Sequence, residues 1–274
     1  MYKIGILIPC YNVQISIKDV LTSLSDKVLK KIDTVLAVDN CSNDNTLQVL
    51  KEIKSSELNV GKKLVIIKNS QNYGLGGSQK IGYNYFIENS FSHFMIIHGD
   101  NQGDANDISK DFLNYFEKKS EIDLIYASRF EKNSNISHYN VIRRIANIFF
   151  NIVTYILTGY KMSDSGCGII FYKIDILKNL PFQDLTNSSQ FNPQLNILIH
   201  QLDDLEMAEI PLNWKDSEAE SHIEAVKYCW ILLKILVSYR FNKTIRRKLG
   251  WRLFSKTSQA FKPKIEIISL EENA

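Results

Sequence analysis

Residues 93–104 read His-Phe-Met-Ile-Ile-His-Gly-Asp-Asn-Gln-Gly-Asp. The four apolar residues at 94–97 are too few for a helix and predict a strand that is buried on both faces. The chain then becomes polar at once over residues 98–102, where a glycine loosens the backbone. Ligands of open α/β sheets collect just beyond the carboxyl ends of the strands, so this polar segment is a candidate ligand site.

Within the candidate site, Asp100 supplies a carboxylate and Gln102 supplies an amide oxygen two residues further on. Such oxygens can hold a hard divalent cation against phosphate oxygens, and we hypothesise that Asp100 helps to hold a metal–diphosphate group. The alternative is a turn aspartate that caps the next helix, a role that Asp104 and Asp107 fit better. His98 could add a nitrogen ligand to the metal or donate a hydrogen bond to the diphosphate, although a lone histidine at a strand end is more often a structural residue.

Strand patterns alternate with helical patterns along most of the chain. Strands are predicted at 3–9, 34–38, 64–67, 94–97, 124–127, 169–172 and 208–212, the last of an edge type because it contains a proline. Helices are predicted at 16–30, 46–54, 78–90, 107–118, 141–158, 191–201 and 223–241. The alternation predicts an α/β fold with a mostly parallel central sheet flanked by helices. Three strand ends, at 9–12, 39–46 and 98–104, carry polar clusters, and we expect them on one edge of the sheet, where a nucleotide would bind.

The composition is that of an ordinary globular protein of 274 residues, 45% apolar and 23% charged, with a formal net charge of +3. This mild basicity does not favour nucleic acid as a partner. The four cysteines are far apart and form no CxxC pair, so neither a zinc site nor a disulfide framework is predicted, and a cytoplasmic setting fits. No signal-peptide pattern and no uncharged apolar run of about 18–20 residues is found, so we expect a soluble or peripheral protein.

Two apolar helices each allow two interpretations. Helix 141–158 begins with Arg143 and Arg144 and could rest on a membrane, although a core position is slightly favoured. Helix 223–241 is amphipathic, and a cationic cluster follows it at residues 243–248. A bilayer interface and packing against the domain are equally favoured for it. We therefore divide the end of the chain into a helical extension at 223–254, peripheral on a membrane in the first interpretation, and a polar tail at 255–274.

Six segments, in order along the chain, resemble family 2 glycosyltransferases with the GT-A fold, a Rossmann-like fold of nucleotide-diphospho-sugar transferases. The resemblance is strongest to the branch that transfers sugars to dolichol or polyprenyl phosphate, and it covers roughly residues 3–215. The segments are Ile-Pro-Cys-Tyr-Asn at 8–12, Val-Asp-Asn-Cys-Ser-Asn-Asp-Asn-Thr at 38–46, Asn-Tyr-Gly-Leu-Gly at 72–76, His-Gly-Asp-Asn-Gln at 98–102, Ala-Ser-Arg-Phe at 127–130 and Asp-Ser-Gly-Cys-Gly at 164–168. Residues 1–222 are accordingly predicted to form the GT-A domain.

The resemblance implies a role for individual residues. Asp100 matches the family's DxD-type element, whose Mg²⁺ or Mn²⁺ bridges the donor diphosphate, and Gln102 matches a position that can assist the metal. Asp39 would lie near the base and Asn40 near the ribose of a UDP- or GDP-sugar. The other donor-binding candidates are Pro9, Tyr11, Asn12, Gly74, Gly76 and Gly99. Arg129 and Arg143 match cations that hold the phosphate of the acceptor.

Several of these positions keep a second interpretation. Asp39 could form an Asx turn before helix 46–54, and the glycines at 74–77 could approach the donor or simply form a turn, because their spacing does not fit a dinucleotide loop. Arg129 and Arg143 could be solvated surface residues. A phosphate acceptor needs no general base, whereas a hydroxyl acceptor does, and Asp164 is then the first catalytic candidate. Its alternative role is to cap the turn through Gly166.

The chain also departs from the family pattern. Val13 replaces a frequent glutamate, Asn40 replaces the usual second aspartate, and His98 replaces the first aspartate of the DxD element. Residues 218–222 lack the familiar arginine, which weakens the assignment of the acceptor more than that of the fold.

We predict a metal-dependent and, by the resemblance, inverting glycosyltransferase on the cytoplasmic face of a membrane. It would move a sugar from a nucleotide donor to a polyprenyl phosphate or saccharide, in cell-envelope glycan synthesis. A non-catalytic nucleotide-sugar-binding module is the alternative. Nucleotidyl transfer is the least favoured hypothesis, because residues 10–13 lack the glycine-rich basic loop that it needs.

Overall fold

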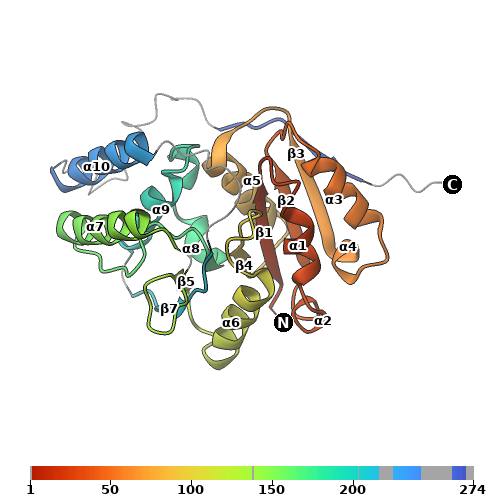
Figure 1. Cartoon of the computed structure of the whole chain (residues 1–274), viewed down its shortest axis with the longest axis horizontal. Coiled ribbons are helices and arrows are strands. Elements are labelled where there is room, and N and C mark those ends of the chain that lie inside the picture. Colours follow the sequence, from red (N-terminus) through yellow and green to blue (C-terminus); the bar gives the residue numbers. More distant parts are fainter. Residues whose placement is uncertain (1, 138, 203, 216–224, 242–260, 270–274) are drawn as a thin grey trace.

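The fold is that of a computed structural model, which describes residues 2–137, 139–202, 204–215, 225–241 and 261–269 (Figure 1). The strands are β1 (Ile4–Cys10), β2 (Thr34–Asp39), β3 (Leu64–Asn69), β4 (His93–Ile96), β5 (Leu124–Ser128), β6 (Ile170–Lys173), β7 (Met207–Pro211) and β8 (Ile265–Ile268). The helices are α1 (Ile17–Ser23), α2 (Asp26–Leu29), α3 (Thr46–Ser55), α4 (Asn59–Lys63), α5 (Gly74–Glu88), α6 (Ala105–Lys118), α7 (Val141–Thr158), α8 (Ile174–Lys178), α9 (Phe191–Ile199) and α10 (Ala225–Phe241), with a short 3₁₀ helix η1 (Phe182–Asp184). Each predicted strand is present, with bounds that agree within two residues.

The strands of the described residues form one sheet in the order β7-β5-β6-β4-β1-β2-β3-β8. The pairs β1–β2, β1–β4, β2–β3 and β5–β7 are parallel, whereas β6 and β8 run antiparallel to their neighbours. The predicted α/β fold with a mostly parallel sheet flanked by helices is confirmed. The register pairs Cys10 with Asp39, so the carboxyl ends of β1 and β2 lie side by side, as the polar clusters predicted.

The apolar runs of the central strands are buried on both faces of the sheet. Ile6 belongs to the core cluster on one face and Leu7 to the cluster on the other, and both are fully buried. The first cluster includes residues of α1, α3 and α6, and the second includes residues of α5, α9 and α10. Because successive side chains of a strand point to opposite faces, a strand covered on both sides reads as a continuous apolar run.

Two helices differ from their predicted bounds. The predicted helix 16–30 is two helices, α1 and α2, because Leu24 and Ser25 have extended backbone conformations between them. The predicted helix 78–90 begins earlier, so the glycines at 74–77 form the first turn of α5 and not a loop. Gly74 has φ +77°, a left-handed conformation that only glycine adopts readily, and this allows the abrupt change from strand to helix.

The predicted polar tail, 255–274, contains a strand that the sequence did not indicate. Its residues Ile265–Ile268 form β8, which pairs antiparallel with β3 at the edge of the sheet. Ile268 packs into the core of the first face, whereas Ile265 and Ile267 are exposed. A run of four residues that contains a glutamate is too short to predict from periodicity alone.

The slight preference for a core position of helix 141–158 was wrong. α7 lies beside α10 at one end of the molecule, away from the end that holds α3 and α4 (Figure 1). Its exposed apolar residues are Val141, Ile142, Ile145, Ile148, Phe149, Ile152, Tyr155 and Ile156. In the described part of the chain, α7 is the one helix that is long and apolar enough to cross a membrane by length and composition alone, with a mean hydropathy of 1.3, and only 6% of its residues are buried.

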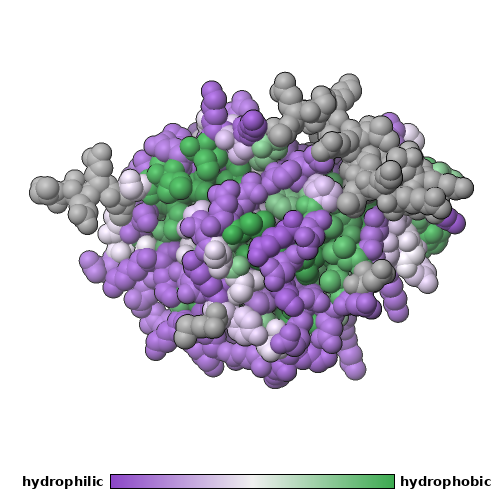
Figure 2. Space-filling view, turned by 180° about the vertical axis from the view of Figure 1, so that it is seen from behind, coloured by the Kyte–Doolittle hydropathy of each residue, from purple (hydrophilic) through white to green (hydrophobic). Residues whose placement is uncertain are grey.

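α10 packs one side against the domain, but it is less amphipathic than predicted, because apolar residues also lie on its exposed side. Leu232, Ile235 and Leu236 are buried in the second core cluster, whereas Trp230 and Phe241 are exposed. The cationic cluster at 243–248 and the segment 218–222 lie outside the described residues. On the face that is turned away from the viewer in Figure 1, hydrophobic residues also reach the surface in several separate places between hydrophilic ones (Figure 2).

Candidate active site

The loops that follow β1 and β2 are locked together by hydrogen bonds. The backbone N–H of Asn12 donates to Ser42 Oγ over 3.0 Å, and the N–H of Asn43 donates to Asn12 Oδ1 over 2.9 Å. Asn12 and Cys41 both have left-handed backbone conformations, with φ 53° and 59°. The two loops therefore form one rigid rim, which holds the predicted donor residues Pro9, Tyr11 and Asn12 beside Asp39 and Asn40.

Asp39 ends β2 at this rim, and its carboxylate is buried. Burial raises the pKa of Asp39 above its ordinary value, and a hydrogen bond from Ser42 opposes this shift only in part. The alternative role of Asp39, starting the next helix, belongs to Asp44, whose Oδ1 accepts from the backbone N–H of Thr46 over 2.9 Å. The carboxylate of Asp39 is therefore not needed by the helix and stays a candidate for binding a donor N–H group.

Asn40 holds a neighbouring loop in place. Its Oδ1 accepts from Asn69 Nδ2 and from the backbone N–H of Tyr73, both over 2.9 Å, and its Nδ2 donates to Asn72 Oδ1 over 2.8 Å. An aspartate at this position could not make the last of these bonds. The departure from the family pattern at Asn40 thus serves the contact between the ends of β2 and β3.

Asp100 lies in the loop beyond β4, next to the loop of β1. A Cβ on Gly99 would lie 3.4 Å from the carbonyl oxygen of Pro9, and the carbonyl of Gly99 accepts from Ser16 Oγ over 2.7 Å. Asp100 Oδ1 accepts from the backbone N–H of Gln102 over 3.2 Å. All three predicted strand ends therefore meet at one edge of the sheet, and the rim comprises the loops that follow β1, β2 and β4.

The role of capping the next helix belongs to another aspartate, as predicted. Asp104 is the N-cap of α6, and its Oδ1 accepts from the backbone N–H of Asp107 over 2.8 Å. Asp100 is half-buried and is not used by the helix. The described residues contain no group of three or more histidine, cysteine or acidic side chains that could hold a metal by themselves. A single carboxylate with one amide oxygen fits a divalent ion that the phosphates of a substrate also hold, because Mg²⁺ is commonly bound by one or two carboxylates and phosphate oxygens.

Gly74 and Gly76 lie close to backbone and side-chain atoms of residues 187–191. A Cβ on Gly74 would meet the carbonyl oxygen of Asn187 at 2.4 Å, and one on Gly76 would meet Phe191 Cβ at 2.5 Å. These glycines therefore let α5 approach the segment before α9 closely. Lys80, in the next turn of α5, is buried and donates to the carbonyl of Leu185 and to Asn187 Oδ1. The structure thus gives the glycine cluster a packing role that the sequence did not indicate.

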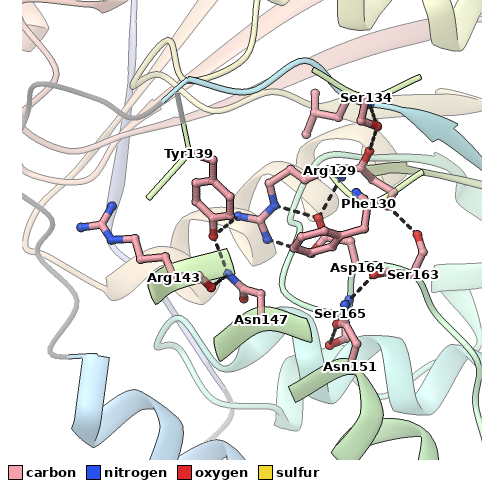
Figure 3. A network of polar contacts seen from close by, with 12 residues as sticks. Arg129, Phe130, Ser134, Tyr139, Arg143, Asn147, Asn151, Ser163, Asp164 and Ser165 are labelled. Carbon is pink, nitrogen blue, oxygen red and sulfur yellow. Dashed lines mark hydrogen bonds and ion pairs between the residues drawn. The ribbon is translucent and has the colours of Figure 1, made fainter. Parts of the chain in front are cut away.

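Arg129 and Asp164 form a buried ion pair (Figure 3). Arg129 Nε donates to Asp164 Oδ2 over 2.7 Å and Nη2 donates to Oδ1 over 2.8 Å, while the backbone N–H of Arg129 donates to Oδ2 over 3.0 Å. Both carboxylate oxygens are therefore engaged. Asp164 does not cap the turn through Gly166 with its side chain, and the structure gives it the task of positioning the guanidinium of Arg129.

The guanidinium of Arg129 is also enclosed by aromatic rings. Its Cζ lies 5.2 Å from the ring centroids of both Tyr139 and Trp214, and Nη1 donates to the Tyr139 hydroxyl over 3.2 Å. Burial opposes the charge, but the hydrogen bonds and the charge of Asp164 outweigh it and raise the pKa of Arg129 above its ordinary value. Arg129 is thus a fixed cation and not a solvated surface residue. Nothing in the spacing of Tyr139 and Trp214 along the chain predicted that they would meet here.

A cavity of about 710 Å³ connects the two parts of the site. It is lined by His98 from the loop of Asp100, by Arg129, and by Arg143 of α7. Apolar residues from three helices line it too: Leu75, Ala146, Phe150 and Leu232. The structure therefore brings the predicted acceptor cations, Arg129 and Arg143, to one cavity beside the Asp100 loop.

The sequence matches the family described as glycosyl transferase family 2 over residues 5–180. UDP-N-acetylglucosamine–dolichyl-phosphate N-acetylglucosaminyltransferase of Methanococcus voltae is 26% identical over 188 residues, which cover 66% of this chain and 73% of that protein. Dolichyl-phosphate β-glucosyltransferase of Saccharomyces cerevisiae is 23% identical over 255 residues, which cover 86% of this chain and 75% of that protein. The predicted resemblance to family 2 and its lipid-phosphate branch is confirmed.

The fold is similar to that of a solved enzyme. Glucosyl-3-phosphoglycerate synthase of Mycobacterium tuberculosis, in complex with Mn²⁺ and UDP-glucose, has a TM-score of 0.61 and 15% sequence identity. The match covers 87% of this chain and 79% of the synthase. At this level of identity the likeness shows the fold, and the predicted GT-A fold is confirmed.

Proposed function

The chain belongs to glycosyl transferase family 2 and is a glycosyltransferase, and we propose that it transfers a sugar from a UDP- or GDP-sugar to a polyprenyl phosphate. In this proposal the donor binds along the rim formed by the loops of β1, β2 and β4, and the acceptor phosphate binds in the cavity that Arg129 and Arg143 line. The relatives from M. voltae and S. cerevisiae, both named for a dolichyl-phosphate substrate, support the choice of acceptor.

At the donor site, Asp100 and Gln102 would hold a Mg²⁺ or Mn²⁺ ion against the diphosphate. When bound, such an ion supplies a Lewis acid that neutralises the charge of the departing diphosphate as the bond to the sugar breaks. Asp39 would accept a hydrogen bond from the base, and the interlocked loops would keep Tyr11 and Asn12 in position before the donor arrives.

At the acceptor site, the cavity itself is the observation that carries the proposal. It combines two cations with apolar side chains from α5, α7 and α10, which is the chemistry that a phosphate on a long hydrocarbon chain requires. Asp164 and Tyr139 occupy three of the five guanidinium N–H groups of Arg129, so within the described residues two are left for the phosphate. A phosphate acceptor is already anionic near neutral pH and needs no general base, which fits an Asp164 carboxylate that is bound to Arg129.

We further propose that α7 rests on the cytoplasmic face of a membrane. Its outward side carries large exposed side chains, among them Ile145, 63% exposed, and Phe149, 58% exposed. Arg143 and Arg144 lie at its start, where they could contact anionic head groups. Arg143 lines the acceptor cavity, so a lipid phosphate could pass from the membrane to the cavity along the same helix.

A transfer assay on the purified chain tests the proposal. Tritiated UDP-N-acetylglucosamine, UDP-glucose or GDP-mannose would be incubated with Mn²⁺ and a short polyprenyl phosphate, and the label extracted into organic solvent would be counted. We expect label in the organic phase with one of these donors, and none when the matched polyprenol without phosphate replaces the acceptor. Transfer to free oligosaccharides, with none to polyprenyl phosphate, would contradict the proposal.

A further inference from the structure

Two polar side chains in the acceptor cavity each have a buried atom with no hydrogen-bond partner among the described residues. His98 Nε2 and Asn192 Oδ1 are both buried atoms without a partner, and Asn192 as a whole is only 7% exposed. Both residues line the cavity. A buried polar atom that is left without a hydrogen bond destabilises the fold, and a cavity of about 710 Å³ has room for a ligand, so this pair at its wall points to a ligand that bonds to both atoms.

The backbone is built to bring these two side chains together. His98 follows β4, Asn192 begins α9, and Gly168 precedes β6, which pairs antiparallel with β4. A Cβ on Gly168 would lie 2.7 Å from Asn192 Nδ2 and 2.9 Å from His98 Nε2. Any larger residue at position 168 would push the pair apart, so the glycine keeps both side chains close to one point.

The chemistry of the pair fits hydroxyl groups better than phosphate. The amide of Asn192 and the imidazole of His98 each offer both a donor and an acceptor, and a sugar hydroxyl also donates and accepts. A phosphate oxygen cannot satisfy an acceptor such as Oδ1, and Arg129 and Arg143 already supply the positive charge that a phosphate needs. His98 lies two residues before Asp100, next to the proposed diphosphate position, where the transferred sugar must lie.

We infer that His98 and Asn192, brought together at Gly168, recognise hydroxyl groups of the transferred sugar. The inference rests on the proposed function, since it places the sugar of a nucleotide donor between Asp100 and the acceptor cations. The pair determines which sugar is accepted, whereas the rim of β1 and β2 determines which nucleotide is accepted.

The experiment compares binding of a sugar nucleotide with binding of the bare nucleotide by calorimetry, in the presence of Mn²⁺. The probes are UDP-glucose, UDP-N-acetylglucosamine and GDP-mannose, each against its nucleoside diphosphate. The Asn192→Leu variant keeps the size of the side chain but removes its hydrogen bonds. We expect it to weaken binding of the preferred sugar nucleotide about tenfold or more and to leave binding of the bare nucleotide unchanged.

A matched control lies one turn along the same helix. Asn196 is also buried, and both its amide atoms lack a partner, but it lines a separate small cavity with His200. Asn196→Leu should leave the ratio of the two affinities at its wild-type value. The inference is overturned if Asn192→Leu also leaves the ratio of the affinity for the sugar nucleotide to that for the bare nucleotide unchanged. This holds whether both affinities fall or neither does. A wild-type chain that binds no nucleotide at all would instead refute the proposed function, and this inference with it.

Discussion

The rim that would bind the donor and the cavity that would bind the acceptor are held together in different ways. The rim is fixed by hydrogen bonds between loops that immediately follow β1 and β2, such as those from Asn12 and Asn43. The cavity depends on one buried ion pair, Arg129–Asp164, which is set among aromatic rings from distant parts of the chain. One outer wall of the cavity, α7, has an apolar side that the described residues leave exposed.

Because of this difference, the rim and the cavity should respond differently to substitution. Rim residues are held by many separate hydrogen bonds, so removal of one side chain should change catalysis more than stability. The residues around the cavity depend on one pair of charges for their stability. Removal of either charge should therefore destabilise this part of the fold. Substitutions on the outer face of α7 should change neither catalysis nor stability.

The largest expected effect is at the rim. Asp100→Asn should lower kcat by about three orders of magnitude, because the metal would lose its charged ligand and several kcal/mol of transition-state stabilisation. The free energy of unfolding should change by no more than about 0.5 kcal/mol. Asp104→Asn, four residues away, is the matched control, since asparagine also caps helices well, and it should keep full activity. Comparable activity in the two variants would remove the metal role of Asp100.

At the cavity, substitution of Arg129 should have a large effect on stability as well as on activity. Arg129→Met leaves the buried Asp164 carboxylate without its counter-charge, and we expect the free energy of unfolding to fall by about 3–5 kcal/mol in urea titrations. Replacing both residues, with Met at 129 and Leu at 164, should restore most of that stability because no unpaired charge stays buried. The double variant should nevertheless be inactive. If it is active with polyprenyl phosphate, Arg129 does not bind the acceptor.

At the rim, we expect a substitution of Asp39 to have a smaller effect on stability, and to raise the free energy of unfolding instead of lowering it. Burial raises the pKa of Asp39, so the folded state binds this proton more tightly than the unfolded chain does. The protonated side chain therefore adds to the free energy of unfolding below pH 3.8, and this contribution is lost as the pH rises through the pKa of the folded state. Asp39→Asn should therefore raise the free energy of unfolding at pH 7, with no gain at pH 3.5. The same variant should bind the donor nucleotide less tightly. A stability gain that does not depend on pH would show that the charge of Asp39 is not its cause.

Substitutions on the outer face of α7 should change stability as little as Asp100→Asn does. The paired substitution of Ile145 and Phe149 by Asp should change the free energy of unfolding by no more than about 0.5 kcal/mol, since both side chains are exposed. It should abolish flotation with liposomes that contain anionic lipids. Leu58→Asp is the control and should float like the wild type, because Leu58 is exposed and directly precedes α4, which lies at the other end of the molecule (Figure 1). Unchanged flotation of the α7 variant would exclude this helix as the membrane contact.

The sequence predicted the rim better than the cavity, for a physical reason. A strand that is buried on both faces and then a polar loop are adjacent in the chain, so Asp39 and Asp100 could be placed at strand ends from local pattern alone. The partnership of Arg129 with Asp164 and the approach of His98 to Asn192 depend on antiparallel β6, whose direction no local pattern encodes. The exposure of α7 was missed because an apolar helix reads the same whether protein or another apolar surface covers it.

The proposed chemistry requires that the carboxylate of Asp100 holds the metal against the donor diphosphate. A crystal structure of the chain with UDP and Mn²⁺, with the anomalous signal of manganese recorded, tests it most directly. We predict one manganese peak bonded to the carboxylate of Asp100 and to the phosphate oxygens of UDP. A manganese peak bonded to other residues, or UDP bound on the rim with no metal near Asp100, would contradict it.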